Sequence, residues 1–195
     1  MNSKIEEMRL KLIKTLDEPR YQHTLGVMYT AASMAMRYGE DVEKALIAGL
    51  LHDCAKCIPG EMKISMCEEN GIEISDIERQ NAGLLHAKLG AFVACKEYGV
   101  EDEGILMSIR SHTTGRPSMT LLEKIIYIAD FMEPGRKELP NMKDVRKLAF
   151  EDIDKCLFRI LKDSLVYLKS RDYAIDPMTE ETYNYYKAIM EGELA

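Results

Sequence analysis

The sequence lacks the features that would take it into a membrane, an oxidising compartment or a complex with nucleic acid. No apolar run approaches the ~18 residues of a membrane span, and the segment 1–7 carries acids where a signal peptide needs an apolar core. Basic residues number 26 against 33 acids, and the net charge of -7 repels DNA and RNA. The 5 cysteines, an odd number, fit reduced thiols. We therefore expect a cytoplasmic protein that binds neither membranes nor nucleic acid.

The sequence also lacks sustained period-two alternation, internal repeats and low-complexity tracts, which argues against β-structure, repeat architectures and disorder. Its 195 residues predict a single domain, 1–195, which would bury roughly 70% of the surface of the unfolded chain. Apolar residues recur at helical spacing in the segments 5–16, 19–38, 41–52, 62–69, 84–98, 102–112, 120–130, 153–168 and 179–189. The sequence therefore predicts an all-α fold, with the stretch 70–80 irregular and Thr179 as the cap of the last helix.

Histidine is scarce, and each copy lies inside or at the end of a predicted helix. The candidate polar cluster consists of the four histidines and two acids that close apolar helices: His23, His52, Asp53, His86, His112 and Asp130. Burying the adjacent pair His52 and Asp53 without partners would cost on the order of several kcal/mol. A metal ion, a salt-bridge network or an exposed helix end would each remove that cost. Because histidine is so scarce, exposed surface positions without a function are a poor explanation for the placement of all four.

The donor atoms of this cluster indicate which metals it would hold. Imidazole nitrogen and carboxylate oxygen together suit the borderline divalent metals, namely iron, manganese, zinc, cobalt and nickel. Magnesium and calcium favour sites dominated by oxygen. Successive helical residues point about 100° apart, so His52 and Asp53 can approach one ion from two directions while the carboxylate bridges to a second. We expect one or two ions, with iron favoured.

The order of these residues resembles the HD-domain superfamily of metal-dependent phosphohydrolases. The superfamily pattern His…His-Asp…Asp matches His23, His52-Asp53 and Asp130, and His86 and His112 match the two further histidines of branches that can hold a second metal. Three segments narrow the resemblance: His-Asp-Cys-Ala-Lys at 52–56, Ser-His-Thr-Thr-Gly-Arg-Pro at 111–117 and Ala-Asp-Phe-Met-Glu-Pro-Gly-Arg at 129–136. They are similar to the YqeK family, the HD-domain symmetrical bis(5'-nucleosyl)-tetraphosphatases, over nearly the whole chain.

That resemblance implies an HD-type helical bundle that hydrolyses diadenosine tetraphosphate into two ADP. His23, His52, Asp53 and Asp130 would hold the principal metal, and His86 and His112 would face the phosphates or a second ion. Asp53 and Lys56 would be the catalytic residues, because Lys56 follows His52 by one helical turn and could meet a phosphate if the turn continues. Arg136 could clamp another phosphate through two parallel hydrogen bonds.

The nucleotide itself, with ADP or GDP as the product, would be bound by a wider set of residues. This set comprises His23, Asp53, His86, His112, Asp130, Phe131, Arg136, Ser170, Arg171, Asp172, Tyr173, Ala174 and Ile175. The partner is thus a small nucleotide, and the resemblance leaves a homodimer open.

Two other functions stay open. The first is an HD-domain phosphohydrolase of another nucleotide, such as a deoxynucleotide triphosphohydrolase or a nucleotidase. Guanosine tetraphosphate hydrolases of the superfamily typically follow His-Asp with an acidic pair, whereas Ala55 and Lys56 stand here, and the Gly-Tyr-Pro signature of cyclic dinucleotide phosphodiesterases is missing. The second is a nucleotide sensor without turnover, which the presence of all six candidate ligands disfavours. Cys54 and Cys57 form a C-x-x-C pair that no second pair completes, so we expect structural thiols.

Overall fold

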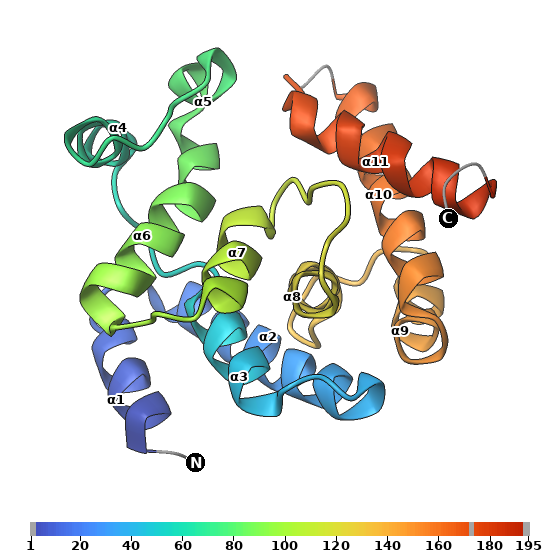
Figure 1. The fold of residues 1–195 in the computed structure, drawn as a ribbon, viewed down its shortest axis with the longest axis horizontal. Coiled ribbons are helices and arrows are strands. Elements are labelled where there is room, and N and C mark those ends of the chain that lie inside the picture. The colour runs from blue at the N-terminus through green and yellow to red at the C-terminus, as the bar shows by residue number, and fades with distance from the viewer. Residues whose placement is uncertain (1–2, 172–173, 193–195) are drawn as a thin grey trace.

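The computed structural model describes residues 3–171 and 174–192, and every regular element within those ranges is helical (Figure 1). In chain order the elements are α1 Ser3–Leu12, α2 Glu18–Tyr38, α3 Val42–Leu51, α4 Gly60–Glu69, α5 Asp76–Gln80, the 3₁₀ turn η1 Ala82–Leu85, α6 His86–Tyr98, α7 Glu103–Ser111, α8 Leu121–Met132, α9 Met142–Glu151, α10 Ile153–Ser170 and α11 Pro177–Met190. The predicted all-α fold is confirmed. Within the same ranges no helix is long and apolar enough to cross a bilayer.

The helix pair α2 and α3 forms the base of the site. The side chain of Asp17 accepts the N–H of Arg20 and so caps α2, and Pro19 occupies its first turn, where a missing N–H costs nothing. The two helices pack closely because α3 presents Gly49 to the backbone of Met28, where a Cβ would lie 2.8 Å from the Met28 Cα. This contact brings the start of α2 next to the end of α3.

Helix α8 packs against this pair and carries the next part of the site. A capping box between Thr120 and Glu123 fixes its first turn, and its apolar face, which includes Ile125 and Ile128, is fully buried. It contacts α2, α3, α7, α9 and α10, so it lies at the centre of the molecule, where Figure 1 shows it end-on. Helices α4 to α6 lie on one side of this centre and α9 to α11 on the other (Figure 1).

Three predictions about individual helices are wrong. The first helix ends at Leu12 rather than 16, because the chain turns at 13–16. The stretch 70–80, predicted as irregular, contains α5, and Ser75 with Glu78 forms the capping box that starts this helix. The last helix is capped by Asp176, whose side chain accepts the N–H of Met178, rather than by Thr179.

Helix α9 was also missed by the sequence analysis. Its buried residues Met142, Val145 and Ala149 have helical spacing, but the segment is polar overall. At Asp152 the backbone is extended, with φ -150 and ψ 102, and the Asp152 side chain accepts the N–H of Lys155 at the start of α10. Asp152 therefore ends α9 and starts α10, and these two helices pack against each other.

Candidate metal centre

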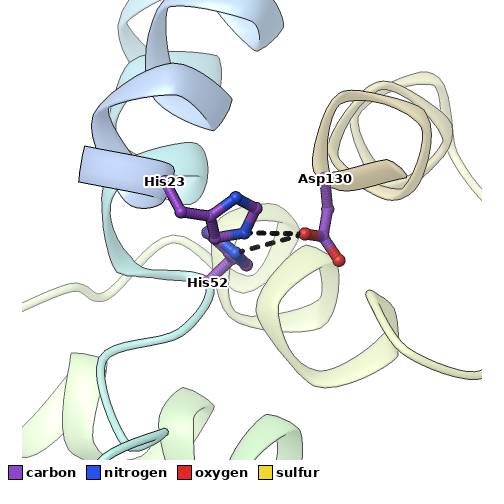
Figure 2. Close-up of side chains that lie close together, drawn as sticks. All are labelled: His23, His52 and Asp130. Carbon is purple, nitrogen blue, oxygen red and sulfur yellow. Dashed lines mark ion pairs between the residues drawn. The ribbon is translucent and has the colours of Figure 1, made fainter. Parts of the chain in front are cut away.

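Six side chains from five helices meet in one place, which we call the His/Asp cluster. Its members are His23 on α2, His52 and Asp53 just after α3, His86 at the start of α6, His112 just after α7 and Asp130 in the last turn of α8. Figure 2 shows His23, His52 and Asp130 pointing toward one another. Nε2 of His23 lies 2.9 Å from Oδ1 of Asp130, and Nε2 of His52 lies 3.7 Å from the same oxygen.

Asp53 is the second carboxylate on which the imidazoles converge, and its side chain is buried. Its Oδ2 lies 3.4 Å from Nε2 of His52. Its Oδ1 lies 3.2 Å from Nε2 of His86 and 3.6 Å from Nε2 of His112. The structure thus brings together all six residues that the sequence pattern singled out.

The hydrogen bonds behind the rings fix which nitrogen carries the proton. Nδ1 of His52, His86 and His112 lies 2.8, 2.6 and 2.7 Å from the carbonyl oxygen three residues earlier in the chain. A carbonyl oxygen only accepts hydrogen bonds, so each Nδ1 must be the donor. In the neutral ring the lone pair is then on Nε2, and in all three residues Nε2 faces the interior of the cluster.

His23 is oriented in the same way by a carboxylate. Its Nδ1 lies 3.0 Å from Oε1 of Glu133, whose side chain is only 3% exposed. The other oxygen, Oε2, accepts the N–H of Gly135 and occupies the space that a Cβ of Gly26 would need. Sequence reasoning missed Glu133, although it is an acid one turn beyond Asp130 on the same segment.

In the cluster, imidazole nitrogens that carry a lone pair face carboxylate oxygens, and both kinds of atom are hydrogen-bond acceptors. Nε2 of His23, Nε2 of His52 and Oδ1 of Asp53 are buried atoms without a hydrogen-bond partner. Lone pairs that face carboxylate oxygens at this range repel one another unless a cation lies between them. The residues present thus fit a bound cation, which would be a proton or a metal ion.

Two overlapping sets of donors could hold such an ion. The first is His23, His52 and Asp130, and the second is His52, Asp53 and His112; in each set the donor atoms lie within 4.8 Å of one another. Imidazole nitrogen combined with carboxylate oxygen suits a borderline divalent metal. A shared His52 is compatible with one ion or two.

Electrostatics favours an ionised Asp53 and a neutral His86. Burial by itself would raise the pKa of Asp53, but the neighbouring rings of His52, His112 and His86 outweigh it and hold that pKa well below its usual value. Burial lowers the pKa of His86 to about 4. At neutral pH His86 therefore keeps a free lone pair on Nε2, and Asp53 keeps its negative charge.

Two cations border Asp53. Arg20 pairs with it, with 2.7 Å between Nη1 and Oδ2. Residues 52–57 form tight turns rather than a continued helix, yet they place Lys56 beside the cluster, with Nζ 3.1 Å from Nε2 of His86 and 3.9 Å from Oδ1 of Asp53. Burial lowers the pKa of Lys56. Both side chains are partly exposed, so they could meet an anion that arrives from solvent.

Arg136 borders the other carboxylate of the cluster. Its Nε donates to the backbone oxygen of Asp130, and its second nitrogen pairs with the Asp130 side chain. A cavity of about 450 Å³ opens beside it, and its walls include His112, Asp130, Phe131 and Arg136. An adjoining cavity of about 690 Å³ shares Phe131 and reaches Arg171.

The predicted nucleotide loop 170–175 is only partly placed. Asp172 and Tyr173 lie outside the described residues. Arg171 lines the second cavity, whereas the Ser170 hydroxyl donates to the backbone oxygen of Tyr167. Ala174 and Ile175 precede α11 and belong to the lining of neither cavity.

Comparisons with known proteins agree with this geometry. The HD domain family model matches residues 20–135. A Bacillus subtilis protein named "Bis(5'-nucleosyl)-tetraphosphatase, symmetrical" is 43% identical over 182 residues, which cover 92% of this chain and 96% of the relative. A Staphylococcus aureus protein of the same name is 37% identical, with 93% and 94% covered.

A solved structure is similar along almost the same length. The Clostridium acetobutylicum protein described as a "predicted HD superfamily hydrolase involved in NAD metabolism" has a TM-score of 0.91 and 44% sequence identity. The match covers 94% of this chain and 97% of that chain.

Proposed function

The chain belongs to the HD domain family, and on that basis we propose that it hydrolyses diadenosine tetraphosphate symmetrically into two ADP. The observation that carries this proposal is the His/Asp cluster, in a chain that is similar to named symmetrical tetraphosphatases over at least 90% of its length. The enzyme is a hydrolase, and its substrate is a small dinucleotide.

We propose that His23, His52, Asp53 and Asp130 hold the principal divalent metal, with His86 and His112 facing the phosphates or a second ion. Iron is the metal we favour, and manganese, cobalt, nickel and zinc also suit a donor set that mixes imidazole nitrogen with carboxylate oxygen. When bound, such an ion lowers the pKa of a coordinated water toward neutrality and neutralises phosphate oxygens.

The chain's own residues would bind and orient the substrate. Lys56, Arg20 and Arg136 present positive charge around the cluster, and they could release their carboxylate partners in favour of phosphate oxygens. Phe131 and Arg136 line the cavity that would take a nucleotide. Together these contacts would fix the phosphate chain over the His/Asp cluster.

The position of the cut follows from holding one ADP unit. A water oxygen forms a bond to the terminal phosphorus of that unit, and the bond from this phosphorus to the central bridging oxygen breaks. The bridging oxygen leaves with the other half as a second ADP, and the water's protons pass to solvent or to the product. Both products are then ADP.

Product analysis tests this proposal directly. The protein is incubated with diadenosine tetraphosphate and each of Fe²⁺, Mn²⁺, Co²⁺, Ni²⁺, Zn²⁺ and Mg²⁺, and the nucleotides are separated by chromatography. We expect ADP as the sole nucleotide product, whereas AMP with ATP would contradict a symmetrical cut. Deoxynucleoside triphosphates, nucleoside monophosphates and NAD in the same panel test the other phosphohydrolase activities. Tight ADP binding without turnover under every metal would point to a sensor.

We propose the cytoplasm as the compartment and a small nucleotide rather than nucleic acid as the partner. All five cysteines are free thiols, which is typical of proteins in a reducing compartment. The net charge of -7 opposes a polyanion, while the cations around the cluster suit a short phosphate chain.

A further inference from the structure

We propose that the second nucleoside of the substrate binds in a cavity between α2, the end of α8 and α9, which we call the α2–α9 cavity. The tetraphosphate chain would then cross the His/Asp cluster with one nucleoside on each side. This inference rests on the proposed function and adds where the far half of the substrate lies. Figure 1 shows α2, α8 and α9 as neighbours, and α9 contacts both of the other helices.

The α2–α9 cavity has the size and lining that a nucleoside needs. Its volume is about 780 Å³. One wall is a face of α2 that includes Gln22, Tyr29 and Thr30, and the opposite wall includes Phe150 on α9. Tyr29 is 51% exposed and Phe150 is 37% exposed. Two accessible aromatic rings on one cavity are suited to stacking on a base, and this contact tolerates any base because every base has a π-face.

A groove connects this cavity to the cluster. The groove, of about 550 Å³, shares Pro19, His23, Glu133 and Gly135 with the α2–α9 cavity. Its remaining lining residues are Asp17, Arg20, Arg136 and Lys137, and we call it the cationic groove. Its two acids are already engaged, since Asp17 caps α2 and Glu133 accepts from His23 and Gly135. The groove thus presents three cations: Lys137, and Arg20 and Arg136, which pair with Asp53 and Asp130 of the His/Asp cluster and could turn toward phosphate oxygens.

The groove continues to the cavity on the other side of the cluster. It shares Arg136 and Lys137 with the cavity lined by His112, Asp130 and Phe131. That cavity and the α2–α9 cavity have no lining residue in common. The order along the surface is thus cavity, cationic groove, cavity.

This order matches the chemistry of a dinucleoside tetraphosphate. Such a molecule has two uncharged, aromatic ends joined by a chain of negative charges. A substrate that spans the groove places its phosphates beside Arg20, Arg136 and the His/Asp cluster, and each nucleoside reaches a cavity with an aromatic wall. A mononucleotide would fill only one of the two cavities.

The test compares substrates with one and two nucleosides. The metal-loaded full chain is assayed with diadenosine tetraphosphate and with adenosine 5'-tetraphosphate, which carries the same phosphate chain and a single nucleoside. We expect Tyr29→Ala to lower kcat/KM for the dinucleotide about tenfold, mainly through KM, because a stacking contact is lost. The same variant should leave kcat/KM for adenosine 5'-tetraphosphate unchanged, and Tyr29→Phe should restore the dinucleotide value.

Met36→Ala is the matched control, because Met36 lies on the same helix, is 67% exposed and does not line the cavity. An equal loss with both substrates, or no loss in Tyr29→Ala and Phe150→Ala, would overturn the inference. Light scattering adds a further check. If Tyr29→Ala changed a dimer into a monomer and affected both substrates alike, the surface around the α2–α9 cavity would be a dimer interface. That result would also overturn the inference.

Measuring the binding of a non-hydrolysable substrate analogue tests this inference independently of the proposed hydrolysis. The probe is a diadenosine tetraphosphate analogue with a methylene group in place of the central bridging oxygen, titrated by calorimetry. Weaker binding of the analogue to Tyr29→Ala than to Met36→Ala supports the second nucleoside site even if the wild-type chain cleaves nothing. Equal binding to the two variants overturns it even if the wild-type chain produces ADP.

Discussion

The proton on each imidazole of the cluster is placed by a neighbour outside it. Three rings donate Nδ1–H to the carbonyl three residues earlier, a geometry that the ends of α3, η1 and α7 supply without any further side chain. His23 lies inside a helix whose carbonyls are already used, so it needs a separate acceptor, and Glu133 provides it. Carboxylates that hold a ligating histidine in this way also raise its basicity.

Glu133→Gln should therefore weaken metal binding. The neutral amide is a weaker acceptor for Nδ1–H, and its NH₂ group could turn toward the ring, so we expect the affinity for Co²⁺ to fall by roughly 10- to 100-fold. Competition titration against a coloured chelator measures this directly. Glu123→Gln is the control, because Glu123 is an equally buried carboxylate that pairs with Arg116 rather than with the cluster. Equal affinity in the two variants would contradict the role of Glu133.

Asp53 should be indispensable for turnover but not for folding. Its carboxylate lies within 4.0 Å of a ring nitrogen of all four histidines and pairs with Arg20. Its loss removes one donor of the second candidate metal set. We expect Asp53→Ala to lower the hydrolysis rate by at least the ~100-fold that loss of an outer-shell partner can cost. Circular dichroism should show unchanged helicity. Retained turnover in a helical variant would remove Asp53 from the mechanism.

The cysteines should react in the order of their exposure. Cys57 is exposed and Cys95 half-buried, whereas Cys54, Cys67 and Cys156 are buried. Burial raises the pKa of Cys54 and raises the pKa of Cys156 to about 12, so neither forms a thiolate near neutral pH. Brief iodoacetamide treatment at pH 8 followed by mass spectrometry should find Cys57 modified first and Cys54 unmodified. A Cys54–Cys57 disulfide under mild oxidation would contradict structural thiols.

At the scale of elements, α8 starts with a charge pair that controls its acid stability. Arg116 binds both oxygens of Glu123 at 2.6 Å, and Glu123 also accepts from Thr120 N–H and the Ser111 hydroxyl. Burial raises the pKa of Glu123, but the Arg116 guanidinium and the bonds from Thr120 outweigh it, so the pKa is lower than its ordinary value of 4.5. A lowered carboxyl pKa adds stability above about 4.5, and this stability is lost as the pH falls through the folded-state pKa.

Glu123→Gln should therefore destabilise the protein at pH 7 more than at low pH. The amide cannot bind the guanidinium through two charged oxygens, and we expect a loss of about 1–3 kcal/mol in the free energy of unfolding at pH 7. As the pH falls through the lowered pKa of Glu123, the wild-type carboxyl protonates and resembles the amide, so the difference should shrink. Urea unfolding at pH 7 and at a series of lower pH values measures both quantities. A difference that grows toward low pH would contradict this assignment.

The helices differ in how well they can be predicted from the sequence. Helices α3 and α8 are rich in apolar residues, with His52 directly after α3 and Asp130 in the last turn of α8, so both the helices and their chemistry were predictable. Helix α5 was missed even though Ser75 and Glu78 form a capping box, because five residues are too short to show periodicity. Helix α9 was missed because its three buried positions lie in a polar segment. Glu133 and Arg20 could not be assigned, since their partners His23 and Asp53 lie 110 and 33 positions away.

At the scale of the whole molecule, the cluster joins helices that are far apart in the chain. Its order along the sequence was recognised through the family pattern, because spacing alone says nothing about which helix ends meet. The structure shows that α2, α3, α6, α7 and α8 all contribute a side chain. An ion held there would connect five helices and should stabilise the native chain relative to the unfolded one.

Removing the metal should therefore lower the melting temperature. An ion at 100 times its Kd adds about 2.7 kcal/mol of stability, and for a chain of this size each kcal/mol shifts Tm by about 2–4 °C. We expect a chelator to lower Tm by roughly 5–10 °C relative to the metal-loaded protein. Thermal scans followed by circular dichroism measure this shift. An unchanged Tm with every ion tested would contradict a metal in the cluster.

The close contact between α2 and α3 has a practical consequence for redesign. Gly49 touches the Met28 backbone, and its carbonyl also accepts the Nδ1–H of His52. One backbone position thus governs both the gap between two helices and the tilt of an imidazole. Gly49→Ala would place a methyl group 2.8 Å from the Met28 Cα, so α2 and α3 would have to move apart, and the imidazole of His52 would shift with the Gly49 carbonyl.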